Sequence, residues 1–297
     1  TNDTPVRRRG CAGLFFFMML VLGAGWGAAL GGFIWMVNDA SDHVAQAFAG
    51  FRPKIGSKVF SSDGQLIGEF SIEQRQLVRL CDIPLHVQKA FIATEDNTFY
   101  SHKGVRPDAI LNALLYKVQT GRTRGGSTIT MQVVRNVEPL EVGQERTYAR
   151  KLDEAIVSFQ VERNFTKDEI LELYLNQTFL GISAFGVEAA SRQYFGKSVQ
   201  DLTLGEAATL AGLTRWPNRN NPIRQLEKAK ERRDIVLQQM VEEGFITEEQ
   251  RAAAKAEDLA AEVVGGADNP EKPELSTLPR QALQAPYFVE EVRKFVD

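Results

Sequence analysis

The stretch from Pro84 to Gly104, PLHVQKAFIATEDNTFYSHKG, decides what kind of domain this chain forms. Its first half places apolar residues at helical spacing behind a proline, which is favoured in the first turn of a helix. Its second half sets two adjacent carboxylates, Glu95 and Asp96, at the end of that helix, before an aromatic residue, a histidine and a glycine. The stretch therefore predicts a helix that ends in a loop equipped for chemistry.

Helical patterns continue through most of the chain that follows. Thr166 begins a capping-box sequence, in which the threonine and Glu169 satisfy the first backbone N–H groups of the next helix. Further helices are expected over residues 107–121, 148–162, 186–195, 204–213, 224–243, 247–256 and 285–296. The fold class is therefore predicted to be mostly α.

A small β region is expected ahead of these helices. Residues 58–60 and 66–70 flank a Ser-Ser-Asp-Gly-Gln turn, which is typical of a β-hairpin. A further strand is expected over residues 76–80. Residues 264–281, rich in Gly, Pro and Glu, read as a linker.

The apolar segment at residues 11–37 predicts the cellular compartment. It carries no charge and, at 1.5 Å per residue, is long enough to cross a hydrocarbon core of about 30 Å, and it is too long for a cleaved signal peptide. Three arginines precede it and acidic residues follow. The positive-inside rule then predicts a cytoplasmic tail (1–10), a transmembrane anchor (11–37), a stalk (38–56) and a domain on the outer side of the membrane.

Composition limits the remaining classes of function. A net charge of −3 over 297 residues excludes a generally basic, nucleic-acid-binding chain, so an anionic ligand would need local basic clusters. Hydrophobic residues at 43% exclude wholesale disorder. Cys11 and Cys81 lie in separate segments and are not expected to form a disulfide. Glycines 23, 27 and 31 have GxxxG spacing, which suits packing against a partner helix but is also common in membrane helices.

Two more clusters accompany the Glu95 loop. Residues 125–136, GGSTITMQVVRN, place paired glycines and Ser-Thr at a helix start, where backbone N–H groups favour phosphate. Arg150, Lys151 and Glu154 lie on neighbouring turns of one helix and can reach one site together. Each feature alone is more typical of a cap or a solvated surface. Residues 195–198 fail as a P-loop because Ser191 replaces its first glycine, and the serine acyl-transfer motifs are absent.

In combination and in this order, five motifs resemble glycosyltransferase family 51. This family comprises the peptidoglycan glycosyltransferase domains of class A penicillin-binding proteins and the monofunctional transglycosylases. The motifs are EDNTFYSHKG (95–104), GGSTITMQVVRN (125–136), RKLDE (150–154), KDEILELYLNQTFLG (167–181) and NRNNP (218–222). The resemblance implies a lysozyme-like glycosyltransferase domain over residues 57–260. It also implies that residues 261–297 are a linker toward a transpeptidase domain.

The resemblance further implies the reaction and the roles of residues. The family polymerises lipid II into β-1,4-linked glycan strands with inversion and releases undecaprenyl pyrophosphate. Glu95 is then the catalytic base toward the acceptor 4-hydroxyl, and Glu154 assists at the pyrophosphate or at a bound Mg²⁺ or Mn²⁺ ion. Residues expected to bind substrate are Asp96, His102, Ser127, Thr128, Gln132, Arg135, Arg150 and Lys151. Residues expected to shape the groove are Phe99, Gly104, Gly126, Asn136, Lys167, Glu172, Asn176 and Gly181.

Some positions depart from the family pattern. Met131 stands where the family usually has a glutamine, and Asn220 where tyrosine is common. Arg135 replaces a usual lysine, and it keeps the charge while adding bidentate phosphate geometry. The spacing from Asn136 to Glu154 is a few residues longer than is usual in the family. None of these changes removes a catalytic carboxylate.

The expected partners are lipid II, the nascent glycan strand and the bilayer, with no nucleic acid. Residues 110–116 are apolar and basic residues follow, which suits a helix at the lipid surface as well as an ordinary core helix. Two other functions stay open on the sequence. A lysozyme-like hydrolase would share the helix-end glutamate but would not need the basic cluster around Arg150. A non-enzymatic scaffold would recruit cell-wall synthesis proteins through the anchor, but it would not need both glutamates.

Overall fold

A computed structural model gives the fold of the chain. It describes residues 57–60, 62, 66–70, 74–106, 108, 119–120, 126–136 and 148–264, with scattered positions between 19 and 32. The described helices are α2 (Leu85–Glu95), α4 (Ile129–Asn136), α5 (Tyr148–Asn164), α6 (Lys167–Gln177), α7 (Val187–Phe195), α8 (Leu204–Leu213), α9 (Leu226–Glu242), α10 (Glu248–Ala256) and α11 (Leu259–Glu262). The 3₁₀ turns are η1 (Leu80–Asp82) and η3 (Val199–Asp201), and the strands are β1 (Ser57–Phe60), β2 (Leu66–Phe70), β3 (Gln74–Arg75) and β4 (Ala184–Phe185). The predicted mostly α class is confirmed.

Most helices begin where the local sequence predicts. The Thr166 side chain accepts a hydrogen bond from the Glu169 amide while the Glu169 carboxylate accepts one from the Thr166 amide, so the predicted capping box starts α6. Thr203 and Thr247 start α8 and α10 in the same way. Pro84 is the residue immediately before α2 and not its first helical residue. Short polar caps thus fix the helix boundaries.

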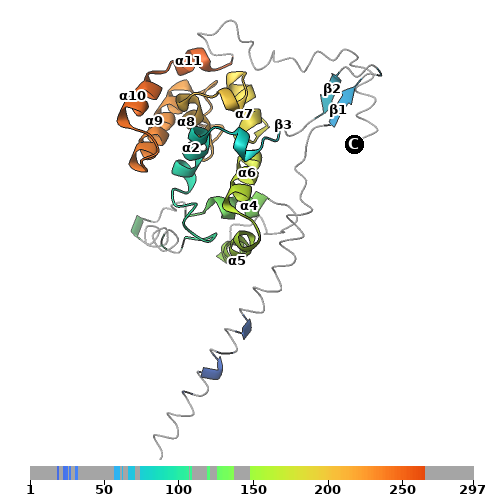
Figure 1. The fold of residues 1–297 in the computed structure, drawn as a ribbon, viewed down its shortest axis with the longest axis vertical. Helices are drawn as coiled ribbons and strands as arrows, with labels where there is room; N and C mark the ends of the chain where they lie inside the picture. Colours follow the sequence, from blue (N-terminus) through green and yellow to red (C-terminus); the bar gives the residue numbers. More distant parts are fainter. Residues whose placement is uncertain are drawn as a thin grey trace, which may run out of the picture.

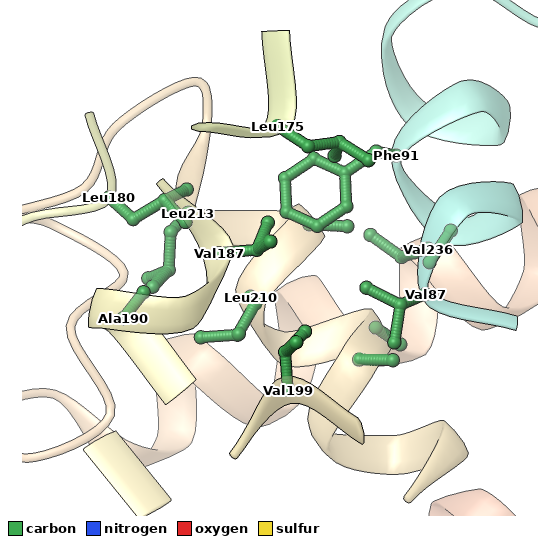
Figure 2. Close-up of a cluster of buried hydrophobic side chains, with 14 of the residues drawn as sticks. Val87, Phe91, Leu175, Leu180, Val187, Ala190, Val199, Leu210, Leu213 and Val236 are labelled. Carbon is green, nitrogen blue, oxygen red and sulfur yellow. The ribbon is translucent and has the colours of Figure 1, made fainter. Parts of the chain in front are cut away.

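The hydrophobic core is built around α8. Every residue of this helix from Gly205 to Leu213 is buried, because its small side chains let neighbouring helices approach closely on all sides. α2, α7 and α9 pack against it (Figure 1). Val87 and Phe91 of α2 enter the same cluster as Leu210 and Val236, as Figure 2 shows. This packing holds the end of α2, where Glu95 lies, against the end of α8.

A second group of helices, α4, α5 and α6, lies beside the loop that follows α2 (Figure 1). α4 is short and packs against both α5 and α6. Its apolar face buries Ile129, Val133 and Val134. From the same helix, Gln132 reaches Glu95 at the end of α2, and Arg135 reaches α5.

The predicted hairpin is confirmed, and the predicted third strand is shifted. β1 pairs antiparallel with β2, with Ser57 opposite Phe70 and an irregularity after Val59. Residues 76–80 do not form a strand; instead, the two-residue β3 lies just before them and pairs parallel with β4. The backbone amides of Val78 and Leu80 are bonded to side chains of α6 and not to a neighbouring strand, as described below.

Several predictions fall on residues that are largely outside the described part of the chain. They are the anchor at 11–37, the tail and stalk around it, the helices at 107–121 and 285–296, and the linker beyond residue 264. The few described positions between 19 and 32 are helical. Within the residues that the structure describes, no helix is both long and apolar enough to cross a membrane.

Candidate active site

Glu95 is held by two elements that are distant in sequence. It is the last residue of α2, and its Oε2 accepts a hydrogen bond of 2.8 Å from Nε2 of Gln132 on α4. Its Oε1 accepts a short hydrogen bond from the hydroxyl of Thr214, the residue that caps the C-terminus of α8. The carboxylate is half-buried. Both oxygens are thus oriented, while the group stays accessible to a ligand.

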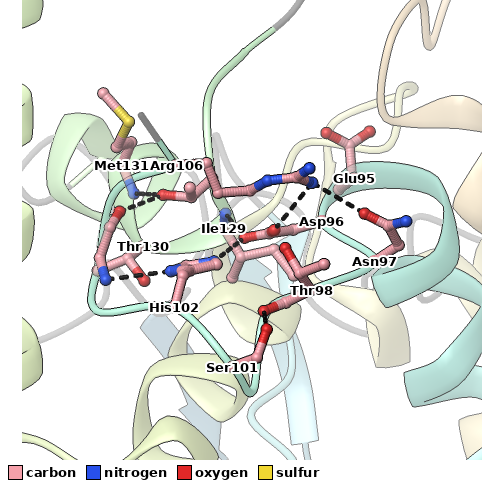
Figure 3. A network of polar contacts seen from close by, with 12 residues as sticks. Glu95, Asp96, Asn97, Thr98, Ser101, His102, Arg106, Ile129, Thr130 and Met131 are labelled. Carbon is pink, nitrogen blue, oxygen red and sulfur yellow. Dashed lines mark hydrogen bonds and ion pairs between the residues drawn. The ribbon is translucent and has the colours of Figure 1, made fainter. Parts of the chain in front are cut away.

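Asp96, next to Glu95, has a different environment. Only 2% of it is exposed, and its Oδ2 accepts from His102 Nε2 at 2.8 Å and from the Ile129 amide at 3.1 Å (Figure 3). His102 Nδ1 in turn accepts from the Gly104 amide at 3.1 Å, which places the ring proton on Nε2, facing Asp96. Asp96 and His102, predicted to bind substrate, therefore bind each other and fix the loop beneath Glu95.

The start of α4 is closed by protein groups. Thr128 is 1% exposed; its hydroxyl donates to the Gly104 carbonyl at 2.6 Å and accepts from the Met131 amide at 3.1 Å. The Ile129 amide is bonded to Asp96. The amides of Ile129 and Met131 are therefore not available to a phosphate, contrary to the sequence expectation for this helix start. Thr128 therefore acts as a helix cap, and both hydrogen bonds of its hydroxyl are to protein backbone groups.

A basic cluster lies on the same face of α4, one turn beyond Gln132. Arg135 Nε and Nη2 donate to the two oxygens of Glu154 at 3.0 and 3.2 Å. Lys151 Nζ donates to Glu154 Oε2 at 2.8 Å, and Arg150 Nε lies 3.5 Å from Oε1. Glu154 itself is fully buried, whereas Arg135 and Lys151 are partly exposed. Among the described residues of this cluster, three cations thus surround one buried carboxylate.

The pKa values of this cluster follow from its burial and charges. Burial raises the pKa of Glu154, but the hydrogen bonds from Arg135 and Lys151 outweigh it, so the pKa is lowered from 4.5. Burial lowers the pKa of Lys151, although Glu154 opposes this shift. Lys151 Nζ also donates to the Ser127 hydroxyl at 2.7 Å. Ser127 therefore contacts the basic cluster, and its predicted contact with substrate stays a prediction.

The surroundings of Glu154 do not fit a metal ion. Both of its oxygens already accept hydrogen bonds from cations, and a divalent ion there would lie beside three like charges. Among the described residues, no group of three or more metal-ligating side chains is present. The expected Mg²⁺ or Mn²⁺ ion therefore has no suitable donor set at Glu154.

Lys167 belongs to a structural group behind the site. Its Nζ donates to Glu162 Oε1 at 2.7 Å and lies 4.4 Å from the ring centroid of the buried Phe99. The buried Thr130 hydroxyl donates to the same Glu162 oxygen at 2.6 Å. These contacts join α4, α5 and α6 behind the Glu95 loop.

Glu172 and Asn176 bond the backbone ahead of α2. Asn176 accepts from the Val78 amide at 2.9 Å and donates to the Val78 carbonyl at 2.8 Å. Glu172 accepts from the Leu80 amide at 2.7 Å. α6 therefore holds the chain that leads into α2.

Two glycines shape tight approaches. Gly104 has φ +86°, and a Cβ there would lie 2.6 Å from the Ser158 carbonyl oxygen. Gly181 has φ +95°, and its Cβ would meet the Tyr194 hydroxyl at 2.6 Å. Both positions therefore require glycine. Of the other two predicted structural residues, Gly126 lies in the irregular segment before α4, and Asn136 is the exposed last residue of α4.

Sequence reasoning missed three residues of this site. Thr214 lies 119 residues from Glu95, and a lone threonine after an apolar helix gives no local signal. Glu162 lies among other charges on α5. Arg106, whose Nη1 lies 4.0 Å from Asp96 Oδ1 and donates to Asn97 at 2.8 Å, follows the first motif closely and could have been included with it.

Comparisons with known proteins find relatives of this chain. The sequence profile of a family described as "Transglycosylase" matches residues 63–241, more than half of the chain. Penicillin-binding protein 1A of Aquifex aeolicus is 46% identical over 201 residues, covering 67% of this chain and 27% of that protein. Penicillin-binding protein 1A of Escherichia coli is 41% identical over 244 residues, covering 82% of this chain and 27% of that protein. The chain thus spans about a quarter of the length of these relatives.

Among solved structures, the crystal structure of penicillin-binding protein 1A from Haemophilus influenzae is similar. It is 28% identical, with a TM-score of 0.39, and the match covers 69% of this chain and 21% of that one.

Proposed function

Because the chain belongs to the transglycosylase family, we propose that it is a peptidoglycan glycosyltransferase that polymerises lipid II into β-1,4-linked glycan strands and releases undecaprenyl pyrophosphate. One observation carries this proposal: α4 links an oriented carboxylate to a basic cluster. Gln132 binds Glu95, and Arg135, one turn later on the same face, binds Glu154.

The chemistry of inverting sugar transfer assigns a role to each group. An attacking hydroxyl needs a base, and Glu95 is the half-buried carboxylate with both oxygens held in place. A departing pyrophosphate needs positive charge more than protonation, and Arg135, Arg150 and Lys151 supply it. Glu154 is bonded to these cations, so its role in this arrangement is to hold them in place. Gln132 both orients Glu95 and lies between the two groups.

The two other functions are less well supported. A hydrolase that cuts neutral glycan has no use for a cluster of three cations around Glu154. A scaffold does not need Glu95 to be oriented by two separate elements. The catalytic role of Glu95 therefore distinguishes the proposals.

The test is product analysis with the full chain in detergent or liposomes. Labelled lipid-linked disaccharide-peptide is supplied, and products are sized on a gel. Wild-type protein should give a ladder of long glycans and Glu95→Gln should give none, while Glu227→Gln, which changes an exposed carboxylate on α9, should behave as wild type. A ladder from Glu95→Gln would remove Glu95 from catalysis, and shortening of pre-made glycan would favour the hydrolase.

We also propose that the chain is a single-pass protein of the bacterial inner membrane, with its N-terminus in the cytoplasm and the helical domain outside. The apolar, uncharged run at residues 11–37, preceded by arginines, supports this topology. It would place the site beside a lipid-linked substrate. Partner proteins of cell-wall synthesis that bind through this segment belong to the same proposal.

A further inference from the structure

The hydroxyl of Thr214 has two acceptors within hydrogen-bond distance. Its Oγ1 contacts Glu95 Oε1 and lies 2.9 Å from the carbonyl oxygen of Ala211. Ala211 belongs to the last turn of α8, where carbonyl groups lack their usual partner four residues further along the helix. A threonine hydroxyl carries one proton and therefore donates to one acceptor at a time. Which acceptor it bonds depends on whether Glu95 carries a proton.

The same atomic positions satisfy Glu95 with and without a proton. The ionised carboxylate only accepts hydrogen bonds, so Thr214 then donates to Glu95 Oε1 and not to the Ala211 carbonyl. A proton on Oε1 makes Glu95 the donor, so Thr214 then accepts from Glu95 and donates to the Ala211 carbonyl. Rotation of one hydroxyl hydrogen converts the first arrangement into the second without movement of a heavy atom.

Gln132 determines which oxygen of Glu95 carries the proton. Its amide nitrogen, which is a donor only, donates to Glu95 Oε2 at 2.8 Å. In a protonated carboxyl group the carbonyl oxygen is the better acceptor, so this oxygen stays toward Gln132 and the O–H group is on Oε1, toward Thr214. The two partners of Glu95, from α4 and α8, thus distinguish its two oxygens.

We propose that Thr214 is a positioning residue that holds the proton which Glu95 takes from the acceptor. In the transfer, the acceptor O–H bond breaks and its electron pair forms the bond to the anomeric carbon. The bond from that carbon to the pyrophosphate oxygen breaks, and its electron pair leaves with the pyrophosphate, while the proton passes to Glu95 Oε1. Thr214 then accepts a hydrogen bond from the new O–H group, and its own proton turns to the Ala211 carbonyl. This inference rests on the proposed function, since it takes Glu95 as the base.

A partner of this kind suits a base better than a second fixed donor would. A group that only donates, such as the Gln132 amide nitrogen, stabilises the ionised carboxylate and opposes its protonation. Thr214 bonds Glu95 in both forms, so it orients the carboxylate before the transfer and still bonds it afterwards. Loss of the Thr214 hydroxyl should therefore affect turnover and not the binding of substrate.

The first measurement compares the turnover of Thr214→Val and wild type on lipid-linked disaccharide-peptide, with the full chain in detergent. Valine keeps the shape of threonine but has no hydroxyl. We expect kcat to fall about tenfold, because a base that is free to turn is less often aligned with the acceptor, and KM to stay unchanged. Thr214→Ser should keep most of the wild-type kcat. Thr209→Val is the matched control on the same helix, because the Thr209 hydroxyl donates to the Gly205 carbonyl at 2.8 Å, and it should behave as wild type.

The second measurement is thermal unfolding, which needs no turnover. Glu95→Gln imitates the protonated base, because its side-chain amide can turn the oxygen to Gln132 and the NH₂ group to Thr214. Since the hydroxyl bonds both forms, Thr214→Val should lower the unfolding temperature equally in the wild-type and Glu95→Gln backgrounds. A hydroxyl that only donates to ionised Glu95 would give this loss in the wild-type background alone.

Three results would overturn the role of Thr214. They are a wild-type kcat in Thr214→Val, an equal loss of kcat in Thr214→Ser and Thr214→Val, and a loss of stability confined to the wild-type background. Absence of turnover in the wild type would instead contradict the proposed function. The unfolding comparison would still show whether the hydroxyl bonds both forms of Glu95.

Discussion

Glu154 illustrates how a single buried acid can hold several cations together. Its carboxylate is completely buried, yet its pKa is lowered because hydrogen bonds from Arg135 and Lys151 outweigh the effect of burial. The ionised Glu154 carboxylate is therefore more stable in the folded chain than in the unfolded one. Stability from this group is fully present above the unfolded pKa of 4.5 and is lost as pH falls through the lower folded value.

Glu154→Gln should therefore be destabilising in a pH-dependent way. At neutral pH we expect a loss of about 2 kcal/mol, less than for a fully buried pair because Arg135 and Lys151 are partly exposed. The difference in the free energy of unfolding between wild type and variant should narrow as pH falls below about 4.5, because the wild type then loses the same interaction. Thermal unfolding of both proteins between pH 7 and about pH 3.5 measures it. A difference in stability that stays constant over this range would show that the stabilising effect of Glu154 does not depend on its charge.

The single residues of the site differ in how far sequence could assign them. Glu95 contacts Gln132 of the second motif, and Lys151 of the third motif contacts Ser127, while the roles of these residues toward substrate stay predictions. Thr128 and Asp96 were expected at the substrate, but they are buried and bonded within the protein. A motif identifies residues that occur together. It does not distinguish residues that contact a ligand from residues that hold those in position.

At the scale of elements, α6 acts as a brace for the chain that enters α2. Asn176 binds the amide of Val78, and Glu172 binds the amide of Leu80, so two side chains one turn apart take the place of a neighbouring strand. This bracing fixes the position of α2 and hence of Glu95. It also gives each amide its own partner, which makes the two contacts separable.

Asn176→Ala should release the Val78 amide and leave the Leu80 amide protected. Hydrogen exchange resolved to single amides should show exchange at Val78 faster by about tenfold or more, the effect of losing a net hydrogen bond of about 1 to 1.5 kcal/mol. Glu172→Ala is the matched variant, and it should speed exchange at Leu80 with less effect on Val78. Equal acceleration of both amides in either variant would mean that the segment opens as one unit and that the pairing is not residue by residue.

The positions of helices were predicted better than the hydrogen bonds between distant segments, for a physical reason. Helix starts such as those at Thr166 and Thr203 depend on contacts three residues apart, which any sequence window contains. The bond from Thr214 to Glu95 spans 119 residues, and that from Asn176 to Val78 spans 98. Only the packing of α8 against α2 and of α6 against η1 brings these pairs together. A pattern read along the chain does not contain that information.

At the scale of the whole molecule, the proposed function requires the helical domain to lie outside the membrane that holds its lipid-linked substrate. The chain offers a native probe of this, because Cys81 is a free thiol on the exposed turn η1, just before α2. The other cysteine, Cys11, begins the apolar run at residues 11–37. Cys11→Ser therefore leaves a single labelling site on the domain of interest.

In spheroplasts of cells expressing Cys11→Ser, a membrane-impermeant maleimide should label Cys81 to the same extent before and after lysis. This follows from the arginines at 7–9 ahead of the apolar run, which retain the N-terminus in the cytoplasm and place residue 81 on the opposite side. Cys11→Ser/Cys81→Ser gives the background, and a cytoplasmic thiol protein reports leakage. Labelling of Cys81 only after lysis would place Glu95 and its basic cluster on the cytoplasmic side. The domain would then be separated from externally built glycan, and the polymerase proposal would fail for the intact cell even if the purified chain were active.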